Sequence, residues 1–330
     1  MSTIYVICPD SNIAYGGVKQ LYRHVDALNK SGMDSCIVHK QAGFRCTWFH
    51  NQTRVISQDE MEAAIGGNDY LVFPEIYGPN VTDYLPEIRK VIFNQNSHYT
   101  FSRHSTDARD LKTPYLHPSV VATIVVSEHD TACLEYLFPR MNVFRVRYGL
   151  NDALFHYGAD KQPQIAFMAR KLPDDVLQVI NQLKFRGALS GFELVEIRDR
   201  TEEEVAAILR RAMLFLSFSD RESFGLPPAE AMACGCIVVG YHGNGGREFL
   251  REPYAYPVDA TNLLQFGRTV ERVLTLYRQN PESLREQGRF ASEFILREYS
   301  MPHEEDDVPR TWERIMEPVR AGRLALGTAV

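Results

Sequence analysis

The sequence predicts an α/β protein made of two domains, each with a parallel sheet covered by helices. The chain has 330 residues, which is long enough for two domains that each bury a core. An apolar run at 3–8 is followed by a turn, a helical pattern to about residue 30 and a second apolar run at 35–39. The same order of strand, helix and strand recurs at 214–240. This alternation is typical of doubly wound α/β domains.

The composition narrows the range of partners. Hydrophobic residues make up 45% and charged residues 24% of the chain, as in a soluble globular protein. The net charge of −6 argues against nucleic acid as a partner, while a local basic patch that binds an anionic membrane stays open. No apolar run approaches the roughly 20 residues that a membrane-spanning helix needs. The predicted location is therefore the cytoplasm, with the inner membrane surface as a further option.

The six cysteines are predicted to be free thiols. Their spacing shows neither a disulfide framework nor a paired Cys-x-x-Cys zinc motif. Cys8 falls in a predicted buried strand, and Cys234 and Cys236 flank the end of a predicted helix. Free, buried thiols are typical of proteins in a reducing compartment.

Two glycines, Gly16 and Gly17, open the first predicted helix. A tight turn needs such glycines whatever is bound, so the pair alone is a weak signal. The loop has no Gly-x-Gly-x-x-Gly fingerprint, which disfavours a nicotinamide-dependent dehydrogenase.

Polar residues follow two predicted strands of the first domain. The strand at 69–75 ends on Glu75, and the strand at 90–93 opens onto a polar run at 94–101. Because the carboxyl ends of parallel strands line the ligand crevice of an open sheet, this run is predicted to belong to a binding site. Glu75 either accepts a hydrogen bond from a substrate hydroxyl or stabilises its own turn.

A pair of cations, Arg170 and Lys171, stands at the end of the first predicted strand of the second domain, at 164–169. Arginine offers a planar fork of donors and lysine a point charge, a combination suited to a diphosphate. The alternative is that both are solvated side chains at a strand end.

The stretch 214–248 carries the strongest functional signal. It is predicted to form a strand, a loop, a short helix at 229–234, a second strand and a glycine-rich turn. Pro227 and Pro228 fall in the first turn of the helix, where a missing N–H costs nothing, and Gly235 ends it.

The start of this helix is suited to an anionic ligand. Because the two prolines have no N–H, the donors left for a phosphate are Phe224, Gly225 and Leu226. Two carboxylates flank them, Glu222 in the predicted loop and Glu230 in the helix. Carboxylates accept hydrogen bonds from the paired hydroxyls of sugars, so the pattern predicts a ligand with both a diphosphate and sugars.

The string from 222 to 235, Glu-Ser-Phe-Gly-Leu-Pro-Pro-Ala-Glu-Ala-Met-Ala-Cys-Gly, closely resembles the donor-site motif of GT-B glycosyltransferases of the family 4, or group 1, type. The resemblance is strong over 214–248 and holds only in outline before residue 150. It implies two facing Rossmann-like domains with a cleft between them, the donor mainly on the second and the acceptor mainly on the first. The implied divisions are 1–155, 156–305 and a C-terminal helix at 306–330 that crosses back to the first domain and ends in a frayed tail.

The resemblance also assigns roles in the second domain. It implies that Glu230 accepts from the ribose hydroxyls, and that Glu222 with Ser223 and the amides after it orients the transferred sugar. Arg170 and Lys171 are implied to neutralise the diphosphate, together with the amides at 224–226. The family carries its lysine several residues after its arginine, whereas here the two are adjacent.

In the first domain, the resemblance implies that the loop at Gly16 and Gly17 closes over the donor's phosphates. Family members often have a histidine just past the strand at 90–93 that contacts the donor sugar. This sequence has Asn94-Gln95-Asn96 there, with His98 two residues further on, so either Asn96 or His98 takes that place. No Asp-x-Asp motif is present, and neither a metal nor another cofactor is expected.

The implied function is that of a hexosyltransferase in polysaccharide or glycoconjugate biosynthesis. It would move a sugar from a nucleotide-diphosphate sugar to a sugar, glycan or lipid-linked acceptor, with retention of the anomeric configuration. One alternative is a sugar-nucleotide epimerase of the same fold, which would need an acid–base pair that the sequence does not identify. Another is a non-catalytic nucleotide-sugar-binding protein.

Overall fold

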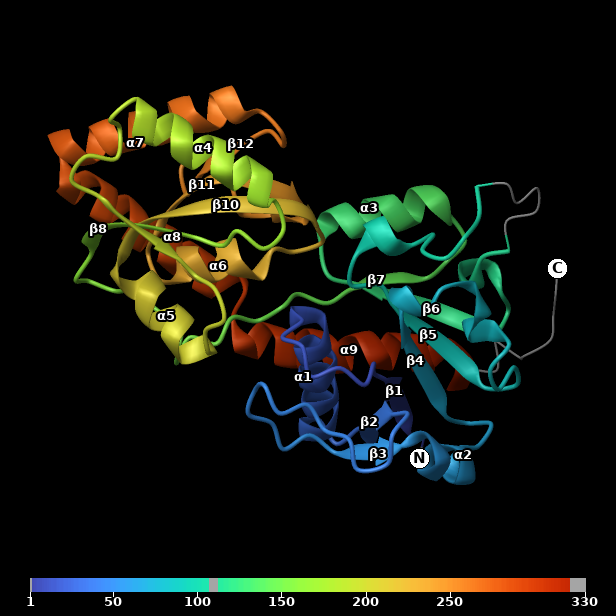
Figure 1. Ribbon diagram of the computed structural model, residues 1–330. Coiled ribbons are helices and arrows are strands. Elements are labelled where there is room, and N and C mark those ends of the chain that lie inside the picture. The colour runs from blue at the N-terminus through green and yellow to red at the C-terminus, as the bar shows by residue number, and fades with distance from the viewer. Residues whose placement is uncertain (1, 107–111, 321–330) are drawn as a thin grey trace. The chain divides into compact units, whose positions relative to one another are not determined.

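The computed structural model describes residues 2–106 and 112–320. The chain forms two compact units, one of Met1–Tyr148 with Pro302–Val330 and one of Gly149–Met301 (Figure 1). The sequence placed these divisions after residues 155 and 305. The frayed tail predicted beyond residue 322 lies outside the described residues.

The first unit is built on a parallel sheet of seven strands in the described residues, in the order β3-β2-β1-β4-β5-β6-β7. The order reverses between β1 and β4, the type of switch point at which open α/β sheets bind ligands. The strands are β1 (Ile4–Ile7), β2 (Ser35–His39), β3 (Val55–Ser57), β4 (Tyr70–Pro74), β5 (Arg89–Phe93), β6 (Val120–Val125) and β7 (Val143–Arg145), and the helices are α1 (Gly16–Lys30), α2 (Gln58–Ala64), α3 (Glu128–Leu137) and α9 (Met301–Arg320).

Side chains of this sheet alternate between two helix layers. In β5, the ring of Phe93 lies 5.0 Å from that of His24 on α1, whereas its neighbour Ile92 packs in a cluster with Leu134 of α3. Successive strand residues point to opposite faces, so a continuous apolar strand can serve both layers. This explains why β1 and β4 read as unbroken apolar runs.

Helix α9 is anchored to α1 through Trp312. The indole is fully buried, and its Nε1–H donates to Nε2 of His24 at 2.8 Å. Burial lowers the pKa of His24 to about 3, so the ring is neutral and can accept this hydrogen bond.

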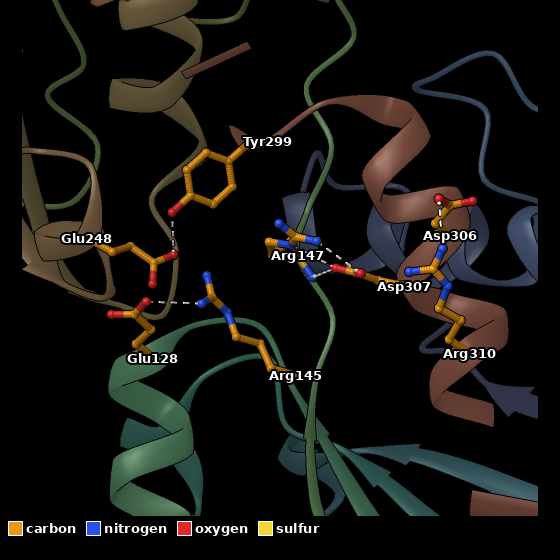
Figure 2. A network of polar contacts seen from close by, with 8 residues as sticks. All are labelled: Glu128, Arg145, Arg147, Glu248, Tyr299, Asp306, Asp307 and Arg310. Atoms are coloured by element: carbon orange, nitrogen blue, oxygen red, sulfur yellow. Dashed lines mark hydrogen bonds and ion pairs between the residues drawn. The ribbon is translucent and has the colours of Figure 1, made fainter. Parts of the chain in front are cut away.

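Helix α9 also begins earlier than the sequence suggested. The sequence implied a C-terminal helix from residue 306, but α9 starts at Met301, and the acidic residues 304–307 lie in its first turns. Glu304 is buried and paired with Arg23 of α1. Asp307 accepts from Nε of Arg147 at 2.8 Å (Figure 2). Partners distant in sequence therefore fix this helix start.

The second unit is built on a five-stranded parallel sheet in the order β12-β11-β10-β8-β9. Helices α4 and α7 cover one face of it, α5 and α6 the other, and α8 packs against α6 and α7 (Figure 1). The strands are β8 (Gln162–Phe167), β9 (Glu193–Glu196), β10 (Ala212–Glu222), β11 (Ile237–Asn244) and β12 (Tyr256–Val258), and the helices are α4 (Pro173–Phe185), α5 (Glu202–Arg211), α6 (Leu226–Ala233), α7 (Leu263–Gln279) and α8 (Pro281–Glu298).

A buried lysine holds α5 and α6 in place. Nζ of Lys161 donates to the carbonyl oxygens of Leu209, Ala212 and Cys234 at 2.7–3.0 Å. These carbonyls lie at the C-terminal ends of α5 and α6, where a cation is favourable. Lys161 thus fixes one end of α6, whose other end begins at Leu226 within the predicted donor motif.

Replacing Trp312 with alanine should lower the free energy of unfolding by about 3–5 kcal/mol, because the cavity left between α1 and α9 cannot collapse fully. Chemical denaturation followed by circular dichroism measures this change. Leu177→Ala on α4, where the leucine is 57% exposed, should change the value by less than about 0.5 kcal/mol. An equally small effect of Trp312→Ala would show that Trp312 does not anchor α9.

Candidate functional site

Glu222 is the last residue of β10 and pairs in register with Asn244 of β11. The loop expected at Glu222 is therefore wrong, because the strand pairing continues through a bulge. Between Ser219 and Glu222, β10 has one residue more than β11 has between His242 and Asn244. Arg221, in the bulge, adopts a left-handed φ of 47°. A bulge of this type turns the strand and re-aims the side chains beyond it.

The turn after β11 lies against Glu222 and Ser223 because it lacks side chains. A Cβ on Gly243 would lie 2.7 Å from Cβ of Glu222, and one on Gly245 would lie 1.7 Å from the carbonyl oxygen of Ser223. Only glycine permits backbones to approach this closely. The glycine-rich turn that the sequence singled out therefore supports the end of β10.

Phe224 anchors the connection from β10 to α6. Its side chain is buried, and its ring lies 5.1 Å from the rings of both Phe249 and Tyr299. Figure 2 shows the Tyr299 hydroxyl directed at Glu248, to which it donates at 2.8 Å. These aromatic contacts hold the backbone at Phe224 and Gly225 in place.

The start of α6 has the predicted anion-binding form. Gly225 caps the helix with a left-handed φ of 91°, and Pro227 and Pro228 lie in the first turn, which confirms their predicted place. Among the described residues, the N–H groups of Gly225 and Leu226 have no partner. The helix starts three residues earlier than expected, and Gly235 follows its end with a φ of 83°, as predicted.

The structure brings Lys171 and Glu222 together as an ion pair. Lys171 lies in the turn between β8 and α4, so the carboxyl ends of β8 and β10 supply the two partners. Arg170, its neighbour, is exposed and has no partner in the described part of the chain. Glu230 is half-buried in the second turn of α6. The two cations thus follow the end of β8, Glu222 lies at the end of β10, and the N–H groups and Glu230 lie in the first two turns of α6.

Within the first unit, the predicted glycines lie at the start of α1. Gly16 is its first residue, and Tyr15 at the N-cap accepts no hydrogen bond with its side chain. A Cβ on Gly17 would lie 3.2 Å from Oε1 of Gln95. The glycine turn and the polar run after β5 are therefore neighbours, as predicted for the carboxyl edge of one sheet.

Within the polar run, two residues have structural roles. Nδ2 of the buried Asn94 donates to Oγ1 of Thr100 at 3.0 Å and to the hydroxyl of Tyr115 at 2.7 Å. The side chain of Asn96 accepts from the backbone N–H of His98 at 3.1 Å. His98 itself is exposed, with its ring 6.1 Å from that of His129. Gln95, which the sequence reasoning passed over, is the member of the run that contacts Gly17.

Glu75 is bonded to the loop that follows β5. Its side chain is buried, and Oε2 accepts from the backbone N–H of Gln95 at 2.9 Å. Burial raises the pKa of Glu75 to about 8, and the nearby charge of Asp130 adds to the rise. Glu75 therefore has a structural role, and the loop that this bond stabilises is the one after β5.

In the described residues, His, Cys, Asp and Glu side chains form no group of three placed to hold a metal ion. No helix of residues 2–106 or 112–320 is long and apolar enough to cross a membrane.

Known proteins match both the sequence and the fold. Residues 195–290 match the family described as glycosyl transferases group 1. An alpha-1,6-glucosyltransferase of Actinobacillus pleuropneumoniae serotype 7 (strain AP76) is 28% identical over 232 residues, 67% of this chain and 67% of the relative. A sucrose-phosphate synthase of Thermosynechococcus elongatus superposes with a TM-score of 0.70 at 14% identity, covering 96% of this chain and all of that one. Anabaena HepE in complex with UDP superposes with a TM-score of 0.65 at 10% identity, covering 95% of this chain and 100% of that one.

These similarities define the class of protein. The two parallel sheets and their helices form a GT-B fold, which confirms the predicted architecture. The matched segment contains the donor motif from Glu222 to Gly235. The chain thus resembles group 1 glycosyltransferases in sequence over residues 195–290 and shares the GT-B fold.

Gly245→Ala should disrupt the support of Glu222 and Ser223, because its Cβ would overlap the Ser223 carbonyl oxygen. We expect a loss of stability of about 2 kcal/mol or more, measured by thermal and chemical unfolding. Gly67→Ala is the matched control, since a Cβ there meets nothing within 4 Å. Equal behaviour of the two variants would contradict the close packing of this turn.

Glu75→Gln should change how stability depends on pH. The pKa of Glu75 is near 8 in the folded chain, above its ordinary 4.5. The free energy of unfolding of the protein therefore falls as pH rises from 5 to 9, because the buried carboxyl group must ionise. Glutamine keeps an acceptor for the Gln95 N–H and does not titrate. Between these pH values, the free energy of unfolding of the unchanged protein should fall by on the order of 4 kcal/mol, at about 1.4 kcal/mol per pKa unit. The variant should lack this fall. If the free energy of unfolding of the two proteins depends on pH in the same way, Glu75 is not the group that titrates.

Proposed function

We propose that this glycosyltransferase moves a hexose from a nucleotide-diphosphate sugar to a hydroxyl of a glycan or a lipid-linked acceptor, with retention and without a metal ion. The observation that carries the proposal is the Lys171–Glu222 pair beside the unused N–H groups at the start of α6. The lysine and the N–H groups suit a leaving diphosphate, and the carboxylate suits a sugar hydroxyl.

The names of the similar proteins suggest the first donor to test. One of them is an alpha-1,6-glucosyltransferase, and another was solved with UDP. We therefore infer that UDP-glucose is the first donor to test. The glucosyltransferase relative also favours transfer over epimerisation.

The reaction needs stabilisation of the leaving group. The bond between C1 of the sugar and the diphosphate oxygen breaks, and the acceptor hydroxyl forms the new bond to C1 and gives up its proton to the departing diphosphate. Negative charge then grows on the diphosphate. Arg170, Lys171 and the N–H groups of Gly225 and Leu226 would stabilise it, and such preorganised groups contribute several kcal/mol. These cations and the helix start take the role that a divalent ion has in other transferases.

The carboxylates would hold the rest of the donor. Glu230, in the second turn of α6, would accept from the paired ribose hydroxyls. Glu222 would accept from hydroxyls of the transferred sugar, with Lys171 orienting its carboxylate. The turn at Gly16 and Gly17 would supply further amides to the phosphates. The six free thiols fit catalysis in a reducing compartment.

Two glutamine substitutions test this assignment. Glu230→Gln should raise KM for UDP-glucose by about tenfold or more with a small effect on kcat, because a hydrogen bond to a charged group contributes roughly 1.5–3 kcal/mol. Glu222→Gln should lower kcat by about 100-fold, because its contacts strengthen in the transition state. UDP release from a panel of nucleotide sugars, with and without glycan acceptors, measures both.

Glu196→Gln on the exposed face of β9 is the matched control and should behave as the unchanged protein. Unaltered turnover in Glu222→Gln would remove Glu222 from the site. Failure of the unchanged protein to bind any UDP-, GDP-, ADP- or dTDP-sugar would overturn the proposed function itself.

A further inference from the structure

A pocket lies at the amino ends of β8 and β9 in the second unit. Its volume is about 410 Å³, and it is lined by residues 162–164 of β8, residues 191–193 at the start of β9 and Arg211 at the end of α5. The predicted donor residues of this unit follow the carboxyl ends of β8 and β10, so this amino-edge pocket lies at the opposite edge of the same sheet. Its volume falls within the range of about 300–1,000 Å³ that is typical of small-molecule sites.

Contacts from α7 hold the turn that forms one wall of the amino-edge pocket. Nη2 of Arg278 donates to the carbonyl oxygens of Ala188 and Ser190 at 2.6 and 3.0 Å. The same guanidinium lies over the ring of Phe192, 5.4 Å from its centroid, and the ring of Tyr277 packs against Phe192 at 5.2 Å. These contacts fix Phe192, which gives the pocket an apolar surface.

Hydrogen-bond donors and acceptors lie together in the lining. Nε2 of Gln164 donates to Oε2 of Glu193 at 2.6 Å, a contact between neighbouring strands that orients both side chains. The contact leaves Oε1 of each residue as an acceptor without a partner in the described part of the chain. The exposed guanidinium of Arg211 likewise has no partner within residues 2–106 and 112–320. The pocket therefore offers both unused donors and unused acceptors.

This combination suits a carbohydrate, because a sugar ring has hydroxyls that donate and accept as well as an apolar face of C–H groups. Arg211 can donate to the hydroxyls, and Gln164 and Glu193 can accept from them. The rings of Phe192 and Pro163 offer apolar surface to the C–H groups. A polyanion is disfavoured, because the carboxylate of Glu193 would repel it. A wholly apolar ligand is disfavoured, because it would cover the polar groups without bonding to them.

We propose that the amino-edge pocket binds one or two sugar residues of a neutral glycan chain, apart from the residues that bind the donor. The inference rests on the proposed function, because an enzyme that extends a glycan meets such chains as acceptor and as product. A chain bound in the pocket stays near the enzyme after one transfer, which raises its effective concentration for the next. An acceptor of one or two sugar residues gains nothing, because it cannot occupy the pocket and the reacting position at once.

The first test measures glycan binding by calorimetry in the absence of a donor, with isomaltohexaose, maltohexaose and cellohexaose as probes. The unchanged protein should bind at least one of these neutral hexasaccharides. Arg211→Met and Glu193→Gln should each weaken this binding about tenfold, because each removes a hydrogen bond to a charged group. The Kd for UDP-glucose should stay unchanged in both variants, because the pocket lies at the other edge of the sheet from the donor residues.

Two further variants serve as control and as an independent test. Arg268→Met on α7 removes an exposed arginine that has no partner among the described residues and does not line the pocket, so hexasaccharide binding should not change. Gly191 has a left-handed φ of 82°, and a Cβ there would meet nothing within 4 Å. Because asparagine tolerates this φ, Gly191→Asn should keep the Tm while its side chain takes up space in the pocket and weakens hexasaccharide binding.

The kinetic test compares a long acceptor with a short one by UDP release. Arg211→Met should raise KM for the hexasaccharide that binds about tenfold, toward the KM for the matching disaccharide. Its KM for the disaccharide and its kcat with either acceptor should match those of the unchanged protein, because the pocket takes no part in the chemical step. An equal rise of KM for both acceptors would show that Arg211 acts on the acceptor site or on folding, and would overturn the inference.

The outcomes separate this inference from the proposed function. If the unchanged protein binds none of the three hexasaccharides, or if Arg211→Met and Glu193→Gln bind them as tightly as the unchanged protein, the glycan site is overturned. The proposed function survives that result as long as nucleotide sugars bind and turn over. If a hexasaccharide binds at the pocket but no nucleotide sugar binds, the proposed function falls and the glycan site stands.

Discussion

The candidate donor site depends on the close approach of two backbones, that of the glycine turn after β11 and that of the end of β10. Gly245 lies so near the carbonyl oxygen of Ser223 that any side chain there would overlap it. The approach allows β10 and β11 to stay paired as far as Glu222 and Asn244. A carboxylate on a paired strand is held more firmly than one on a loop. The contact holds Glu222, which pairs with Lys171 and precedes the start of α6 by four residues.

Both units use buried polar groups to fix the turns that carry predicted site residues. In the second unit, Lys161 donates to the carbonyl oxygen of Cys234 at the C-terminal end of α6. This bond helps to fix the position of the helix whose first N–H groups have no partner among the described residues. In the first unit, Glu75 and Tyr148 hold Gln95 beside the glycines of α1. A buried polar group is tolerated only when its hydrogen bonds are satisfied, so each of these groups specifies one arrangement of its neighbours.

Local signals in the sequence predicted most elements and several of their ends. Thr201 and Glu204 form a capping box at the start of α5, and Ser127 caps α3. The predicted bounds are wrong where residues distant in the chain fix the end of an element. The start of α9 is set by ion pairs to Arg23 and Arg147, which lie more than a hundred residues away in the chain and leave no mark on the acidic run itself.

The class of fold and the position of the helix start after Glu222 follow from local signals, because prolines, glycines and apolar periodicity act through the local backbone. The strand end at Glu222, its pairing with Lys171 and the contact of Gln95 with Gly17 are visible only in the folded chain. These features depend on strand register and on contacts between elements far apart in the chain. Such contacts are chosen by packing and burial of the whole unit, and no short stretch of sequence contains them.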